Sequence, residues 1–261
     1  MPSFTTIRIA ALLAALAVVG FIALHQHVYT RNWSDTLEVV VYPINGDGHT
    51  TTADYIASLS DEDFEIIDRW GIREAQRHDL DLSRPFMVRL GPEIRNHPPL
   101  LSPEATPVDV LIWGIRFRYW AWRNTPDKGS LTRVRMFVMY VEGSDDQPLQ
   151  HSLGMKKGLM GLVHAYATDR QTSQNNIVIA HELLHTVGAT DKYGMGGTPV
   201  FPAGYAYPTR QPLYPQRSAE IMAGRIPTSK SSAYMAESLR SVIINDYTAE
   251  EINWRQTSAS E

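Results

Sequence analysis

The sequence predicts an α/β (α+β) fold, in which a mixed, twisted β-sheet packs against a helix that carries two histidines, followed by a C-terminal helical subdomain. Three observations lead to this prediction. Runs rich in β-branched residues alternate with runs of helical periodicity, several helical runs begin with a capping residue, and no internal repeat divides the chain. We therefore expect residues 31–261 to form one domain that is long enough to bury a full core.

Residues 1–30 are predicted to be a targeting segment outside this domain. The run IAALLAALAVVGFIAL, residues 9–24, is uncharged and mostly apolar, and Arg8 precedes it. Its length lies between that of a signal-peptide core and that of a membrane-spanning helix. Because no convincing cleavage site follows, we expect an uncleaved membrane anchor, with a cleaved signal peptide as the alternative. Both place the domain outside the cytoplasm, in the periplasm or the extracellular space.

The first half of the domain is predicted to begin with a strand, residues 36–45, that ends in the turn NGDG. A helix follows from Ser60, a candidate N-cap with Asp63 three residues later. Residues 86–90 form the next predicted strand, and four prolines within residues 91–106 indicate a loop.

Residues 106–124 are predicted to form a helix, with Thr106 as N-cap and Pro107 at its first position. The alternation in IRFRY also fits a strand, but the longer periodicity favours a helix. The helix carries two apolar stripes, which are Leu111, Ile115, Tyr119 and Trp122 on one face and Trp113, Phe117 and Trp120 on another. Its arginines and aromatic residues could stack on bases, but no basic surplus supports this, so core packing is favoured.

Two further strands, residues 133–141 and 158–167, are predicted before the histidine-bearing helix, which is expected over about residues 173–188. Residues 192–218 are rich in Gly, Pro and Tyr, and this composition indicates a loop.

The C-terminal residues 231–255 are expected to be helical and to close the domain. Thr248 and Glu251 have the spacing of a capping box for the last helix.

Composition narrows the range of partners and metal ligands. The chain has a formal net charge of −4 and no long basic run, so nucleic acid is not an expected partner. It has no cysteine, which excludes disulfides, thiolate metal sites and a cysteine nucleophile. A zinc ion would therefore be held by His, Asp, Glu or Tyr side chains.

The segment HELLHTVGATD has the residues of a metal site at helical spacing. His181 and His185 lie one turn apart on the same face, so both imidazoles can bind one ion. Glu182 projects about 100° further round the helix, where it can reach water at the metal. Gly188 can end the helix through a positive φ, and the returning chain then brings Asp191 in as a third ligand.

This segment resembles the elongated HExxHxxGxx(H/D) motif of the metzincin zinc peptidases, and its aspartate is similar to that of the snapalysin-type enzymes. The resemblance implies a metzincin-like (zincin-like) fold, one catalytic zinc ion and a peptide or protein substrate. It also implies a methionine turn beneath the metal, for which AEIMAGR supplies Met222, in a turn at about residues 220–224. Glu220 is an alternative to Asp191 as third ligand, although a structural salt bridge is its expected role.

The motif predicts zinc-assisted hydrolysis of amide bonds, with Glu182 as general base. Tyr193, Tyr205 and Tyr207 follow closely enough to be candidates for stabilising the oxyanion. His164, at the end of the preceding strand, is a candidate for lining the cleft.

The alternative function is that of a membrane-tethered scaffold protein, in which the same fold binds zinc without catalysis. A structural zinc site has no need of a base, so the presence of Glu182 favours the enzyme.

Overall fold

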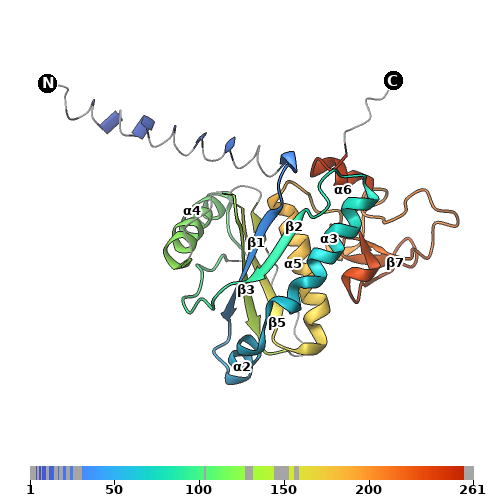
Figure 1. Cartoon of the computed structure of the whole chain (residues 1–261), viewed down its shortest axis with the longest axis horizontal. Coiled ribbons are helices and arrows are strands. Elements are labelled where there is room, and N and C mark those ends of the chain that lie inside the picture. Colours follow the sequence, from blue (N-terminus) through green and yellow to red (C-terminus); the bar gives the residue numbers. More distant parts are fainter. Residues whose placement is uncertain are drawn as a thin grey trace.

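A computed structural model places a five-stranded sheet at the centre of the chain (Figure 1). The structure describes residues 31–102, 104–126, 132–143, 153–155 and 159–255, together with isolated positions between 4 and 25. The strands are β1 (Leu37–Asn45), β2 (Phe86–Leu90), β3 (Val134–Val141), β4 (Leu153–Met155) and β5 (Met160–Tyr166). Their order is β2–β1–β3–β5–β4, with the first four parallel and β4 antiparallel at one edge. The predicted α/β character and mixed sheet are confirmed.

Helices cover both faces of the sheet, as a largely parallel sheet requires. They are α2 (Thr50–Ser58), α3 (Glu65–Arg77), α4 (Pro107–Asn124), α5 (Thr172–Thr186) and the short α6 (Asp246–Glu251). Helices α3 and α5 lie on one face and α4 on the other (Figure 1). Along β1, Val39 and Val41 belong to the core beneath α3 and α5, whereas Val40 and Tyr42 belong to the core beneath α4. This alternation is the period of two that a strand buried on both faces shows.

Two of the predicted helix N-termini are confirmed, because the expected capping residues are in place. The Asp63 carboxylate accepts a hydrogen bond from the Ser60 N–H at 2.8 Å, at the start of a 3-10 turn that leads into α3. Thr106 caps α4 by accepting a hydrogen bond from the Asp109 N–H at 3.3 Å. Residues 107–124 are therefore helical, and the strand interpretation of IRFRY is wrong. The sequence pattern did not predict α2 or β4.

The two apolar stripes of α4 have different surroundings. Trp113, Phe117 and Trp120 pack on the sheet, where the rings of Phe117 and Trp120 meet Phe137 at centroid distances of 5.7 and 4.9 Å. The side chains of the other stripe are 57–66% exposed, and they are Leu111, Ile115, Tyr119 and Trp122.

The predicted C-terminal helical subdomain is wrong. Within residues 231–255, helical structure is confined to a 3-10 turn (Leu239–Ser241) and α6, and two short strands, β8 (Ala233–Met235) and β9 (Val242–Ile243), interrupt it. Their pairing partners are β7 (Arg225–Pro227) and β6 (Ala219–Glu220), which precede this region. The β-branched Val242 and Ile243 pair with β6 and are buried, which outweighs the helical propensity of their neighbours. The last helix, α6, is capped by Asn245, whose side chain accepts from the Thr248 N–H at 2.9 Å, so the expected cap at Thr248 is wrong as well.

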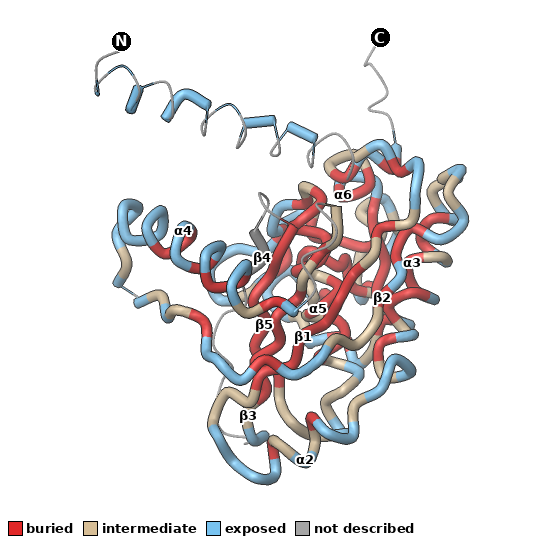
Figure 2. The backbone as a smooth tube through the Cα atoms, turned by 60° about the vertical axis from the view of Figure 1, so that its left-hand side comes forward, coloured by how far each residue is buried: buried red, intermediate tan, exposed pale blue. Residues whose placement is uncertain are grey.

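The predicted membrane anchor at residues 9–24 gains no support from the structure. No helix among the described residues is long and apolar enough to cross a membrane. The described positions of this run are helical and exposed (Figure 2), and the others lie outside the described residues. From Arg31 on the chain contacts the domain, because Arg31 and Trp33 donate hydrogen bonds to the carbonyl groups of Glu251 and Ile252 at 2.7 and 2.6 Å.

Glu74 on α3 is fully buried and joins this helix to the C-terminal segment. Its carboxylate accepts hydrogen bonds from Arg73, Arg77 and the Ile244 N–H at 2.9, 3.2 and 2.9 Å. We expect Glu74→Ala to lower the free energy of unfolding by about 2–4 kcal/mol, because it leaves the buried Ile244 N–H without its acceptor. Urea denaturation of the variant and the parent protein measures this difference.

Glu65→Ala on the same helix is the matched control. Glu65 pairs with Arg69 one turn later, but both side chains are exposed, so the loss of this pair is expected to change stability little. Equal losses of stability in the two variants would contradict the role assigned to Glu74.

Candidate metal centre

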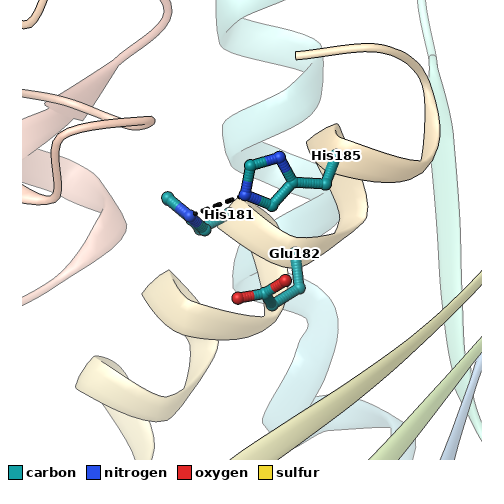
Figure 3. A group of neighbouring side chains, drawn as sticks. All are labelled: His181, Glu182 and His185. Atoms are coloured by element: carbon teal, nitrogen blue, oxygen red, sulfur yellow. Dashed lines mark hydrogen bonds between the residues drawn. The ribbon is translucent and has the colours of Figure 1, made fainter. Parts of the chain in front are cut away.

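Helix α5 presents both histidines of the motif to the same point. Its apolar residues, including Ile179 and Leu183, belong to the core that it shares with β5. His181 and His185 lie one turn apart, with ring centroids 4.7 Å from each other and an interplanar angle of 87° (Figure 3). The predicted helical placement of the pair is therefore confirmed.

The helix ends at the predicted glycine. Gly188 has a φ of +118°, which L side chains rarely adopt. The Ala189 N–H donates to the Leu184 carbonyl at 3.0 Å and closes the last turn. The chain then reverses, and this brings Asp191 to the histidines.

Three side-chain atoms converge beyond this turn. The Nε2 atoms of His181 and His185 lie 3.1 Å apart, and each is 3.1 Å from Oδ1 of Asp191. In a tetrahedral zinc site with bonds of about 2.0–2.1 Å, neighbouring ligand atoms are roughly 3.3 Å apart. The two imidazoles and the carboxylate thus form a triangle, called here the ligand triangle, of the size that one zinc ion needs.

The other ring nitrogens determine which atoms face the centre. Nδ1 of His181 lies 3.0 Å from the Ile221 carbonyl oxygen, and Nδ1 of His185 lies 2.9 Å from the Ala189 carbonyl oxygen. Because a carbonyl oxygen only accepts, each Nδ1 is assigned the proton and donates it. In the neutral histidines, both Nε2 lone pairs then point toward the centre, which is the state that binds a metal.

The charges of the three residues favour a cation. Burial raises the pKa of Asp191, but when the Nε2 atoms of His181 and His185 carry protons, their hydrogen bonds to Asp191 outweigh burial and hold this pKa well below its usual range. Burial lowers the pKa of His181, whereas the hydrogen bond to Asp191 and the charge of Glu182 raise it, and the net shift is upward. The centre therefore stabilises positive charge beside an ionised Asp191.

Glu251 of α6 holds the segment that carries Asp191. Its carboxylate accepts hydrogen bonds from the Thr190 N–H at 2.8 Å and from Nζ of Lys192 at 2.7 Å. The Lys192 N–H donates to the Met222 carbonyl at 3.0 Å. Both neighbours of Asp191 are thereby anchored, which limits the movement of its carboxylate away from the histidines.

Glu182 lies beside the ligand triangle. A carboxylate oxygen of Glu182 and one nitrogen of each imidazole lie within 4.8 Å of one another, so this trio could itself hold an ion. Oδ1 of Asp191 lies 3.1 Å from both Nε2 atoms. Glu182 is buried and, like His181, lines a cavity of about 500 Å³. Its carboxylate is therefore close both to the candidate metal position and to the space that a substrate can enter.

The predicted methionine turn lies next to the centre. The N–H groups of Ala223 and Gly224 both donate to the Glu220 carbonyl, at 3.0 and 2.8 Å, and make the turn tight. Met222 is fully buried in the core that contains α5. The turn contacts the ligand triangle through the Ile221 carbonyl that binds His181.

Glu220, the alternative third ligand, has other partners. Its carboxylate accepts hydrogen bonds from the Met222 N–H and the Thr248 hydroxyl, each at 2.6 Å. The expected salt bridge of Glu220 is not found, because no ion pair of Glu220 occurs within the described part of the chain. Glu220 makes these two hydrogen bonds instead. Burial raises the pKa of Glu220 to about 7. The structure places Glu220 in the turn, and the acid that meets the histidines is Asp191.

Two of the residues predicted to contact substrate line the cavity, namely Tyr193 and His164. The ring of Tyr193 lies 6.3 Å from that of His181, measured between centroids. His164 is buried within β5.

The other two predicted tyrosines do not line this cavity. Tyr205 is buried, and its hydroxyl lies 2.8 Å from that of Tyr214. The ring of Tyr207 faces the Arg77 guanidinium at 5.7 Å. Closeness in sequence was therefore a poor guide to position, because residues of this loop beyond Gly197 do not reach the cavity.

Several groups that orient the ligands could not be found from the sequence. Ile221 and Ala189 act through carbonyl oxygens, which every residue has, so no side-chain pattern points to them. The contact between Lys192 and Glu251 joins residues far apart in the chain. The sequence does show a basic residue, Lys192, directly after Asp191, but it does not indicate which acidic residue pairs with it.

Comparison of the chain with models of known protein families and with curated protein sequences gives no match.

The raised pKa of Glu220 predicts a pH dependence of stability. The ordinary pKa of a glutamate carboxyl is 4.5, whereas the pKa of Glu220 in the folded state is about 7, so between these values the folded state binds more protons than the unfolded state. The free energy of unfolding should therefore fall as the pH rises from about 4.5 to about 7. Glu220→Gln keeps an acceptor and the shape of the side chain, and it is expected to flatten this dependence.

Denaturation at a series of pH values, with a chelator present so that metal binding does not contribute, measures the effect. Glu62→Gln on the exposed surface is the control and should keep the parental slope. A Glu220→Gln variant with that same slope would show that Glu220 is not the group responsible.

Proposed function

We propose that the chain is a zinc-dependent endopeptidase that hydrolyses a peptide or protein substrate. The observation that carries this proposal is the ligand triangle of His181, His185 and Asp191, with Glu182 beside it on the wall of a cavity. Three protein ligands leave one position of a tetrahedral zinc ion for water, as in catalytic zinc sites. The metzincin-like motif supports the same function, and the apolar run at residues 9–24 supports a location outside the cytoplasm.

The residues of this site fit a zinc ion, since imidazole and carboxylate groups are common zinc ligands and the distances agree with its bond lengths. When bound, zinc supplies a Lewis acid that acidifies water and polarises the scissile carbonyl group. Glu182 is placed to accept the proton of the attacking water and to return it to the leaving amine. The hydrogen bonds at Nδ1 of His181 and His185 keep both rings oriented throughout.

Tyr193 is the group best placed to stabilise the oxyanion that forms on the substrate. Burial, together with the charges of Asp191 and Glu182, raises the pKa of Tyr193 to about 12. Its hydroxyl therefore keeps its proton at neutral pH and can donate a hydrogen bond. The cavity of about 500 Å³ falls in the range of small-molecule sites, so it has room for a few substrate groups beside this hydroxyl.

Glu182→Gln separates the chemistry from metal binding. The amide has nearly the shape of the carboxylate but cannot take up a proton, so we expect hydrolysis to fall by about 10³-fold while the bound zinc remains. Cleavage of an unfolded casein-type substrate and elemental analysis of the purified protein measure the two quantities.

Retained hydrolysis in Glu182→Gln would contradict the proposed mechanism. A parent protein that holds zinc but cleaves neither this substrate nor a library of random peptides would instead favour the zinc-binding scaffold, which is the alternative function.

Asp191→Asn tests the third ligand. Loss of the anionic oxygen is expected to weaken zinc binding by about 100-fold, as measured by competition with a chelator of known affinity. Asp169→Asn, at an exposed position before α5, is the matched control, and Glu220→Gln should also keep zinc. Loss of zinc in Glu220→Gln together with retention in Asp191→Asn would reverse the assignment of the ligand.

A further inference from the structure

The outer face of α4 is apolar and exposed. It consists of side chains that are each at least 44% exposed, and they are Val108, Leu111, Ile112, Ile115, Tyr119 and Trp122. At about 100° per residue, these six positions lie within an arc of about 100° on the helix. The opposite side of the same helix is already buried against the sheet. A helix at the surface normally turns polar residues outward, so this outer face indicates a binding surface.

Arginines border the outer face of α4. Arg116 and Arg123 lie along one border and are exposed. Arg118 lies along the other, where its guanidinium donates to the Gly114 carbonyl at 3.0 Å. The one acid of this helix, Asp109, is engaged by the capping residue at its start. The helix therefore combines an apolar stripe, a tyrosine and a tryptophan with a net positive charge.

We propose that the outer face of α4 is a docking surface for an anionic phospholipid bilayer, with the helix parallel to the membrane plane. The apolar stripe would enter the boundary of the acyl chains, and the bordering arginines would meet the lipid phosphates. Long arginine side chains can lie along apolar surface and keep their charged ends at the phosphate level. The sequence carries a second uncharged, apolar run in residues 9–24, and a chain with two such segments fits a location beside a bilayer. This proposal does not depend on zinc or on catalysis.

The absence of cysteine from the sequence allows a single introduced thiol to report on α4 in the full chain. Ile115→Cys, labelled with the polarity-sensitive dye nitrobenzoxadiazole, is mixed with vesicles of roughly one-third phosphatidylglycerol in phosphatidylcholine. We expect the emission to move to shorter wavelength, to rise about twofold or more, and to become protected from an aqueous quencher. Lys230→Cys, exposed between β7 and β8, is the matched control and should not respond.

Three outcomes would overturn the proposal. Vesicle binding without a response at position 115 would show that another segment, such as residues 9–24, makes the contact. A dye already shielded in buffer would show that a second copy or another part of the chain covers α4. An equal response on phosphatidylcholine alone would show that the arginines do not select an anionic surface.

The contribution of the arginines has a test of its own. Arg116→Gln combined with Arg123→Gln is expected to weaken the vesicle affinity of the labelled chain by roughly tenfold or more, since each basic residue near an anionic surface strengthens binding. Arg69→Gln combined with Arg240→Gln removes the same charge from exposed positions elsewhere and should leave the affinity unchanged. An equal loss of vesicle affinity in both double variants would show that only the overall charge matters, which would contradict a specific role of α4.

Discussion

Two imidazole lone pairs and a carboxylate oxygen directed at one point repel one another unless positive charge lies among them. In this protein the three atoms are held 3.1 Å apart, and the groups that hold them are other parts of the fold. The carbonyl groups of Ala189 and Ile221 orient the rings, and Glu251 anchors the segment of the carboxylate. All three lie after α5 in the chain. The histidine helix therefore supplies two candidate ligands, and the C-terminal region determines whether they can meet the third.

This dependence explains why the C-terminal region, although poor in regular structure, is bound so closely to the rest of the domain. Trp70 of α3 donates a hydrogen bond to the Val242 carbonyl at 3.0 Å, and Trp33 donates to that of Ile252 at 2.6 Å. The buried Glu74 accepts from the Ile244 N–H. These bonds satisfy backbone groups of β9, of the residue that follows it and of the end of α6. Side chains of the first half of the domain thereby fix the backbone that positions the candidate metal ligands.

The parts that the sequence predicted are those in which the signal is local. The i, i+4 spacing of His181 and His185 and the positive φ of Gly188 depend on a few neighbouring residues, and both are found as expected. The helical prediction for residues 231–255 holds at α6 but failed at β9, because burial of Val242 and Ile243 against distant elements outweighs local propensity.

The contrast between local signals and contacts across the fold also applies to the candidate metal centre. The orienting carbonyl groups and the partner of Lys192 depend on contacts between distant segments, which no spacing rule describes. Periodicity also revealed two apolar stripes on α4 without showing which of them faces the core, since both satisfy the helical repeat. That difference matters for function. Helix α5, which carries Glu182 and several residues that line the cavity, packs on one face of the sheet and α4 on the other (Figure 1). A bilayer held against α4 would lie across the sheet from Glu182, so the cavity would remain open to the aqueous phase and to a soluble substrate.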